Sequence, residues 1–153
     1  NQLRADERLS ILLDIPAKHK GVMIAPFIGK VDLEPYLASG QLKTVFADGE
    51  NYDGARPLHY EWVKLLYDQC RKYNVPFSFF GTGNVFIKDG KEYHICKAYQ
   101  HVQALRSGLQ YPAVEQDAPF KHAAVPASGE IHVMDAGGAE GVEYPPITLW
   151  VIQ

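Results

Sequence analysis

The chain has 153 residues, of which 46% are hydrophobic and 22% are charged, which is typical of one soluble globular domain. Its formal net charge of −3 gives no general attraction to nucleic acid phosphates. No apolar run approaches the roughly 18 residues that span a membrane, and no charged-then-apolar signal segment opens the chain. Two cysteines without a CxxC pair suit a reducing compartment, so we expect a cytoplasmic protein. Because the chain begins with Asn1 rather than Met, we expect a fragment or a processed product.

The first half of the chain alternates helix-like and strand-like segments. Apolar residues on one face predict a helix over residues 5–13, and the apolar run 21–26 between breakers predicts a buried strand. A short helix is expected over 32–37, where Pro35 suits the first turn. Residues 43–47 are expected to form the second strand.

A regular helix and a third strand follow. Residues 60–73 carry apolar side chains at 3.6-residue spacing, with Arg71 and Lys72 in the last turn, where cations favour the helix dipole. Residues 75–80 predict a strand that ends at a glycine-containing turn. Strand, helix and strand with short connections predict parallel pairing through a right-handed crossover.

The second half of the chain has a different pattern. Asp89-Gly90 between two β-prone runs predicts a hairpin with a type I′ turn, because both residues tolerate positive φ. The fold class that we expect is α/β: a partial (β/α) barrel, or a small parallel sheet flanked by helices, followed by a hairpin, a helix and a strand-containing extension. We expect a domain over 1–110 with the extension 111–153 packed on it. The remaining expected elements are a helix over 99–106, a loop over 111–129 and strands over 130–134 and 147–152.

The strand that begins near Leu42 ends in a loop dense with polar residues, and a helix follows at once. Strand, polar loop and helix form the unit that carries chemistry at the carboxyl end of a parallel strand. Arginine offers a planar fork for carboxylate or phosphate, and histidine titrates near neutrality. No residue is assigned a catalytic role. The residues that we expect to bind a substrate are Asp48, Glu50, Asn51, Arg56 and His59.

A structural role for the same loop is the alternative. Glu50 would accept hydrogen bonds from loop N–H groups and pair with Arg56, while Asn51, Asp53 and Gly54 shape the turn. The sequence leaves both interpretations open.

Three other features favour structural roles. The run 81–84 contains two glycines after a strand, but it has neither GxGxxG nor P-loop spacing, so we expect a structural turn. The six histidines form no HxH or HxxxH pair, so no metal site is expected. Cys70 lies on the apolar side of the main helix and is expected to be a buried, unreactive thiol.

Several short motifs follow one another along the chain. They are, in order, Asn1-Gln2, Ala5-Asp6-Glu7-Arg8, Gly49-Glu50-Asn51-Tyr52-Asp53-Gly54-Ala55-Arg56-Pro57, Trp62-Val63 and Asp68-Gln69-Cys70. Together with the run 82–91, this succession resembles a family of phage-associated radical-SAM-like proteins that have no firmly assigned activity, over about residues 1–110.

The resemblance implies the C-terminal half of a partial (β/α) barrel. In such proteins, three cysteines of the N-terminal half hold a [4Fe–4S] cluster, and S-adenosylmethionine binds there. Those cysteines are absent here, and Cys70 and Cys96 do not replace them. Both cofactors are therefore implied only together with an N-terminal half, and the chain alone is expected to be inactive. Many members carry a polar residue after the third strand, where this chain has Phe80-Gly81.

Two functions remain open. The first is a fragment of an enzyme that contributes a substrate-side polar loop. The second is a non-enzymatic binding or assembly domain, because half a barrel leaves sheet edges and an apolar face uncovered. The partner would be the chain's own N-terminal half or a second copy in a homodimer, to which the apolar run 147–152 would contribute. Neither a membrane nor a nucleic acid is expected as a partner.

Overall fold

The structure is a computed structural model that describes residues 1–112, 130–131 and 147–148. The chain divides into two compact units, Asn1–Val114 and Glu115–Gln153. In the second unit, β7 (Glu130–Ile131) and β8 (Ile147–Thr148) pair antiparallel. These two short strands lie within the expected strands 130–134 and 147–152. The rest of those strands, and the expected loop from residue 113 to 129, lie outside the described residues.

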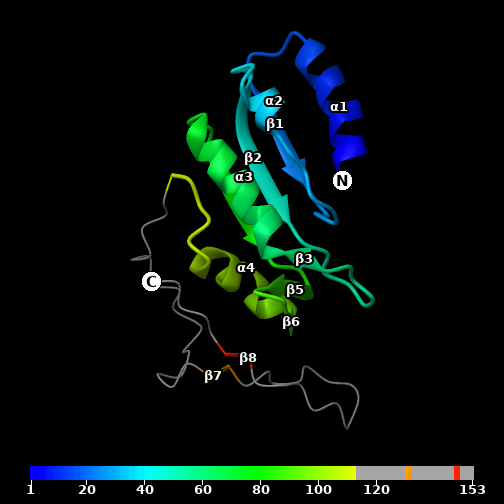
Figure 1. The fold of residues 1–153 in the computed structure, drawn as a ribbon, viewed down its shortest axis with the longest axis vertical. Coiled ribbons are helices and arrows are strands. Elements are labelled where there is room, and N and C mark those ends of the chain that lie inside the picture. The colour runs from blue at the N-terminus through cyan, green and yellow to red at the C-terminus, as the bar shows by residue number, and fades with distance from the viewer. Residues whose placement is uncertain (113–129, 132–146, 149–153) are drawn as a thin grey trace. The chain divides into compact units, whose positions relative to one another are not determined.

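A three-stranded parallel sheet forms the centre of the first unit (Figure 1). Its strands are β1 (Lys20–Ile24), β2 (Leu42–Asp48) and β4 (Phe77–Gly81), in the order β1-β2-β4. Both strand pairs are parallel, as the sequence predicts for β2 and β4. The register shifts between Ala47 and Asp48, so that Asp48 is paired with Gly81. The three carboxyl ends therefore meet at one edge of the sheet.

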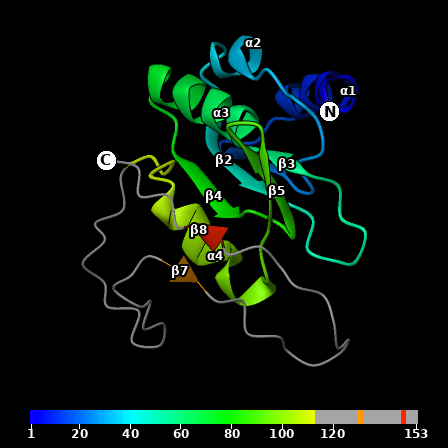
Figure 2. The same cartoon turned by 60° about the horizontal axis from the view of Figure 1, so that its bottom comes forward.

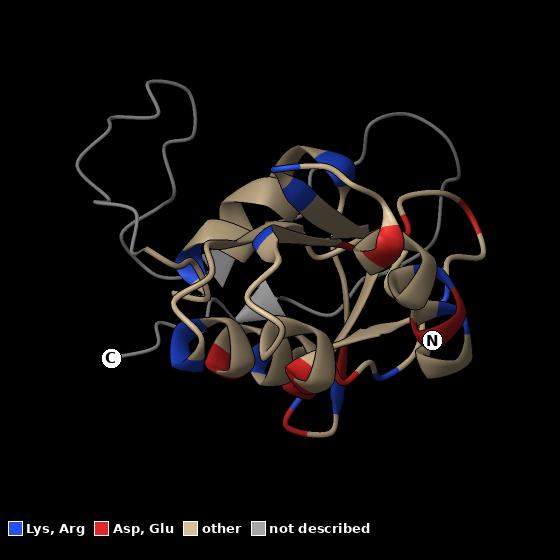
Figure 3. Ribbon diagram, turned by 90° about the horizontal axis from the view of Figure 1, so that it is seen from above, with Lys and Arg blue, Asp and Glu red and all other residues tan. Residues whose placement is uncertain are grey.

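Three helices lie together on one side of this sheet (Figure 2). They are α1 (Gln2–Asp14), α2 (Glu34–Leu37) and α3 (Tyr60–Lys72). Helix α1 starts earlier than expected because the Asn1 side chain accepts a hydrogen bond from the N–H of Arg4 at 3.2 Å. In the described residues, no helix is long and apolar enough to cross a lipid bilayer. Acidic and basic residues are interspersed along α1 and α3 (Figure 3).

The two faces of the parallel sheet differ in burial. Val45, Ala47, Phe77 and Phe79 alternate along β2 and β4 and are at most 1% exposed, so they form the core on one face. The opposite face carries Met23, which is paired with Phe46, and Phe80, whose ring lies 5.5 Å from that of Phe46. Met23 is 59% exposed and Phe80 is 43% exposed. Within the described residues this face is not enclosed, and no barrel is closed.

A second sheet and a fourth helix follow the parallel sheet in the chain. Strand β3 (Leu58–His59) pairs parallel with β5 (Val85–Lys88), which pairs antiparallel with β6 (Lys91–His94). Asp89 and Gly90 in the turn have φ of 51° and 73°, which confirms the expected left-handed turn. Helix α4 (Lys97–Arg106) begins two residues earlier than expected and packs beside the end of β4.

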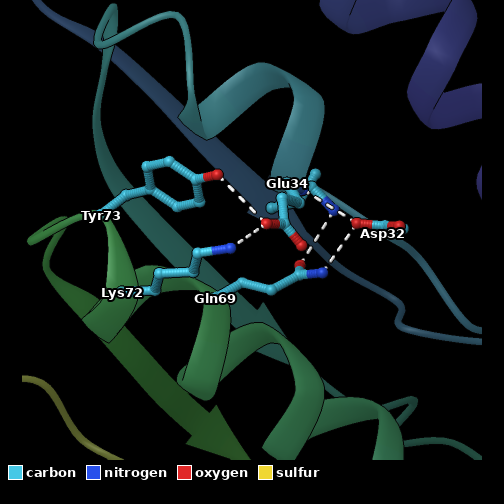
Figure 4. Close-up of polar contacts among 6 residues, drawn as sticks. Asp32, Glu34, Gln69, Lys72 and Tyr73 are labelled. Carbon is cyan, nitrogen blue, oxygen red and sulfur yellow. Dashed lines mark hydrogen bonds and ion pairs between the residues drawn. The ribbon is translucent and has the colours of Figure 1, made fainter.

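Polar contacts join α2 to α3 (Figure 4). The Gln69 Oε1 atom accepts a hydrogen bond from the N–H of Leu33 at 3.0 Å, and its Nε2 atom donates to Asp32 Oδ1 at 2.7 Å. Glu34 accepts hydrogen bonds from Lys72 and from the Tyr73 hydroxyl. The polar face of α3 thus fixes the start of α2.

Backbone N–H and C=O groups on the outer edge of β4 also have hydrogen-bond partners. The N–H and C=O of Phe77 exchange hydrogen bonds with the backbone of Tyr111. The Gln110 side chain does the same for Phe79: its Oε1 atom accepts from the N–H at 3.1 Å and its Nε2 atom donates to the C=O at 2.8 Å. This edge is therefore closed by its own chain.

Candidate functional site

The loop after β2 is folded around the Glu50 carboxylate. This carboxylate accepts a hydrogen bond from the backbone N–H of Arg56 at 2.7 Å and from the Arg56 Nε atom, which lies 3.1 Å from both carboxylate oxygens. The Arg56 Nη2 atom also donates to Glu50. The Glu50 side chain is 1% exposed, whereas that of Arg56 is 56% exposed. One carboxylate thus ties both ends of the segment 50–56 together.

These contacts set the ionisation of Glu50. The hydrogen bonds from the Arg56 side chain lower its pKa to about 2, against an opposing effect of burial, and the Arg56 N–H and Tyr52 lower it further. Glu50 is therefore a charged structural acceptor at neutral pH. This arrangement matches the structural alternative for Glu50 and Arg56.

A second loop lies directly against the first. The N–H of Gly49 donates to the C=O of Gly81 at 3.0 Å, and the N–H of Asn84 donates to the C=O of Glu50 at 2.7 Å. A Cβ atom on Gly49 would lie 2.5 Å from the C=O oxygen of Thr82. The glycines in both loops therefore permit backbone-to-backbone contact, which is the structural role expected for the run 81–84.

An open cleft of about 320 Å³ lies at the carboxyl ends of the parallel strands. It draws residues from β1, β2, β4, the loop after β2 and the first half of α4. Its position is the one at which parallel α/β sheets bind ligands. The lining residues are Met23, Asp48, Asn51, Phe80, Gly81, Lys97, Gln100 and His101.

Asp48 is the half-buried acid of this cleft. Burial raises its pKa above the ordinary value, while the Gly49 N–H and the charge of His101 act in the opposite direction. A Cβ atom on Gly81 would lie 2.7 Å from Asp48 Oδ1. The absence of a side chain at Gly81 therefore leaves the space into which the Asp48 carboxylate turns.

Helix α4 brings a histidine that the sequence does not reveal as a site residue. The His101 Nδ1 atom lies 2.6 Å from the C=O oxygen of Phe80. Because a carbonyl oxygen only accepts, this contact assigns a proton to Nδ1. The ring also stacks on Phe80, with centroids 6.5 Å apart. His101 is thereby held beside the cleft in a fixed orientation.

The five residues proposed from sequence fall into three groups. Asp48 and Asn51 line the cleft. Glu50 and Arg56 pair with each other and hold the loop. His59 stacks on Trp62, with ring centroids 4.2 Å apart, and is not among the residues that line the cleft.

Three cleft residues from α4 are missing from that sequence-based set: Lys97, Gln100 and His101. They are separated from Asp48 by the whole of β4 and the hairpin. Their i, i+3 and i+4 spacing puts them on one side of a helix, which is the one signal that the sequence offers. It does not say what that side faces.

The residues present do not fit an iron–sulfur cluster. Cys70 is fully buried in α3, as expected, and burial raises the pKa of its thiol to about 12. Cys96 precedes α4 and is half-buried. In the part of the chain that the structure describes, no three His, Cys, Asp or Glu side chains gather in a way that could hold a metal ion.

The chain was compared with known protein families. Residues 1–124 match the profile of a family described as "Protein of unknown function (DUF5131)". The chain belongs to the DUF5131 family. No curated protein and no solved structure matches it. The DUF5131 match covers the parallel sheet, the cleft and the loop that Glu50 holds, but its description names no activity. The radical-SAM-like relationship and the phage association therefore remain predictions.

Proposed function

We propose that this chain is the substrate-facing half of a radical-SAM-like (β/α)-barrel enzyme, and that the cleft at the carboxyl ends of β1, β2 and β4 binds the substrate. The observation that carries the proposal is the cleft itself. It lies on the sheet face that α1, α2 and α3 leave uncovered, with an acid, two amides, a lysine and a histidine around it. In barrel enzymes this edge of the sheet holds the active site.

The direction of α1 supports a barrel-like arrangement. Its N-cap residue, Asn1, lies against the loop that follows the carboxyl end of β1, where a Cβ atom on Gly29 would be 3.2 Å from the Asn1 Cβ. Its last turn lies at the amino end of β1, where Lys20 Nζ donates to the C=O of Leu13 at 2.6 Å. Helix α1 therefore runs antiparallel to β1, as the helix of a βαβ unit does.

The uncovered sheet face also suits the interior of a barrel. The residues on this face are small near the amino ends of the strands, at Gly21 and Thr44. They are large near the carboxyl ends, at Met23, Phe46 and Phe80. Barrel interiors are filled by layers of such inward-pointing side chains. In this proposal the remaining strands of the barrel would cover them.

The proposal gives the sequence-derived residues different roles. Asp48 and Asn51 contact the substrate, because they line the cleft. Glu50 and Arg56 are positioning residues that hold the loop in shape. His59 acts only through Trp62, on which it stacks.

The cluster and S-adenosylmethionine would be held by a different half of the protein. Neither Cys70 nor Cys96 offers a suitable ligand set, so no chemical step is derived through these groups here. The test is the sequence of the intact gene product, in which we expect three closely spaced cysteines upstream of Asn1. We also expect the intact product to retain iron and sulfide after anaerobic reconstitution. An intact product without those cysteines overturns the radical-SAM-like assignment and, with it, the expected phage context.

A non-enzymatic assembly domain is the second candidate, favoured by the exposed Met23 and Phe80 on the uncovered sheet face. A homodimer through this face would dissociate when Met23 is replaced by Lys, because the new charge would be buried at the contact. Sedimentation equilibrium of the chain and of Met23→Lys tests this. A monomer at every concentration rules out the homodimer.

A further inference from the structure

The outer edge of β1 is an edge of the parallel sheet that the described chain leaves open. In the order β1-β2-β4, β1 pairs with β2, and among residues 1–112 no other backbone hydrogen bond reaches residues 21–25. The opposite edge, on β4, is closed by Tyr111 and Gln110. The run 21–24 contains neither a charge nor a proline, which are common protections of an edge strand. The β1 edge is therefore available to a further strand.

A groove of about 380 Å³ lies between this edge and α1. The run 21–26 lines it from the sheet, and Arg4, Arg8 and Leu12 are among the residues that line it from α1. Figure 1 shows α1 beside β1 at the end of the sheet. Within α1 only Leu9 is buried, although a helix of this length gains most of its stability from packing. A strand added to β1 would fill the groove and cover this side of α1.

The groove is positively charged. Arg4 and Arg8 line it, and no acidic side chain of the described residues does. Arg8 is exposed and makes no ion pair within the part of the chain that the structure describes. Arg4 contacts Glu7 at 2.7 Å, but both side chains are more than half exposed, and such pairs contribute little. Both guanidinium groups are therefore suited to carboxylates of an incoming strand.

The spacing of the side chains along α1 matches the spacing along a strand. Arg4, Arg8 and Leu12 follow one another at intervals of four residues, which is about 6 Å along a helix axis. Side chains on one face of a strand recur at every second residue, which is about 6.6 Å. Because α1 runs antiparallel to β1, a strand parallel to β1 passes Leu12 first, then Arg8 and then Arg4. The matching strand has an apolar residue, a carboxylate two positions later and a second carboxylate two positions after that.

We propose that β1 pairs with a parallel strand from the other half of the protein, and that this strand places two carboxylates, following an apolar residue at alternate positions, against Arg8 and Arg4. The parallel direction follows from the sheet, in which both strand pairs are parallel. A second copy that pairs through its own β1 would bring no carboxylate, since Lys20–Ile24 contains no acidic residue. The source of the strand rests on the proposed function, because a barrel has a strand of the other half next to β1. The chemistry of the strand rests on the groove alone.

The test is isothermal titration calorimetry of the 153-residue chain with a nine-residue peptide. The peptide is threonine throughout, except for valine, glutamate and glutamate at its third, fifth and seventh positions. We expect this peptide to bind. With glutamine in place of both glutamates it should bind about tenfold more weakly, and the difference should shrink in high salt. Equal affinities of the two peptides, or no heat with the glutamate peptide, overturn the proposal.

Backbone pairing needs its own measurement, because charge attraction alone would also produce heat. Amide hydrogen exchange of residues 21–25 should slow when the glutamate peptide binds, while exchange in α3 should stay unchanged. Of two glutamate peptides N-methylated at odd or at even positions, one should lose its binding, because only one set of N–H groups faces β1. Protection at other residues only, or undiminished binding of both methylated peptides, shows attraction without an added strand and overturns the proposal.

Arg8→Gln connects the binding to this groove. It removes the charge and retains a polar side chain, so we expect the glutamate peptide to bind about fivefold more weakly and the glutamine peptide to bind as before. Lys18→Gln is the matched control, because Lys18 is an exposed cation between α1 and β1 that does not line the groove. Equal effects of the two substitutions on the glutamate peptide overturn the assignment of this groove.

The intact gene product tests where the strand comes from. If the other half supplies it, residues 21–25 are protected from exchange in the intact product and the glutamate peptide does not bind there. An intact product that binds the peptide as the 153-residue chain does overturns this source. A dimer of the 153-residue chain in sedimentation equilibrium, with residues 21–25 already protected, puts a second copy on the edge and also overturns it.

This inference and the proposed function fail separately. A 153-residue chain that does not bind the glutamate peptide overturns the acidic strand and leaves the three upstream cysteines to be tested. A gene product without those cysteines overturns the radical-SAM-like assignment, while peptide binding to the groove still supports the acidic strand.

Discussion

Gly83 packs against the backbone of Glu50. It has φ of +73°, and a Cβ atom on it would lie 2.6 Å from the C=O oxygen of Glu50 and 2.9 Å from its N atom. The loop after β4 therefore supports the same residue whose carboxylate holds the loop after β2. The carboxyl edge of the sheet is built from two loops that keep each other in place.

Replacing Gly83 by Ala should therefore lower the free energy of unfolding by more than the positive φ alone explains. Gly54 is the matched control, since it has φ of +77° and open space around its Cβ position. We expect Gly54→Ala to lower the free energy of unfolding by roughly 1 kcal/mol, the cost of positive φ. We expect Gly83→Ala to lower it by about 3 kcal/mol or more, because the backbone of Glu50 has to move. Urea unfolding of both variants measures this, and equal losses would contradict the backbone contact.

The Glu50 carboxylate predicts a pH dependence of stability. Its pKa in the folded chain is about 2, below the ordinary value of 4.5. A lowered pKa stabilises the fold above about pH 4.5, and the stabilisation is lost as the pH falls towards 2. The wild type should thus exceed Glu50→Gln in stability by a constant amount near neutral pH and by less at each step below pH 4.5.

Denaturant unfolding at a series of pH values tests this expectation. Asp53→Asn is the control, since it removes a carboxylate from the same loop that accepts no hydrogen bond among the described residues. Its difference from the wild type, measured over the same range, is the baseline for the Glu50→Gln difference. A Glu50→Gln difference that is flat down to pH 3 would show that the contact with Arg56 does not set the ionisation of Glu50.

Local signals predicted most of the fold. The regular spacing in α3 and the Asp89-Gly90 turn each act over a few residues, so one sequence is enough to find them. The strand–helix–strand succession also predicted the parallel pairing of β2 and β4.

The cleft was predicted only in part, and for a physical reason. Asp48 ends β2 and Asn51 follows it, and such positions can be predicted from the sequence. The approach of Gln100 and His101 depends on how α4 packs beside β4, a contact between distant segments that no local pattern encodes. The sequence predicted only a turn at Gly81. That its missing side chain makes room for the Asp48 carboxylate depends on the packing of two strands.

The Gln69 side chain links α3 to the start of α2, and we expect this link to stabilise the fold. Its Oε1 atom accepts from the N–H of Leu33, which is fully buried. Gln69→Ala would leave that N–H without a partner and should lower the free energy of unfolding by about 1–3 kcal/mol. Gln69→Glu keeps the acceptor but sets a carboxylate against Asp32, to which Gln69 Nε2 donates, and should also destabilise, less so in high salt. Salt-independent losses in both variants would contradict the charge argument.

The Gln110 side chain covers the outer edge of β4, and we expect it to keep this edge from pairing with another chain. Its amide is 7% exposed and takes the place of a neighbouring strand for the N–H and C=O of Phe79. Gln110→Ala should lower the free energy of unfolding by about 2 kcal/mol or more, because two backbone groups lose their partners, and should promote association through the exposed edge. Gln110→Glu retains the acceptor for the N–H but sets a largely buried carboxylate against the C=O of Phe79, so it should also destabilise the fold in urea unfolding. Sedimentation velocity supplies the second measurement. If Gln110→Ala stays monomeric and loses no stability, the edge is protected by the Tyr111 backbone alone.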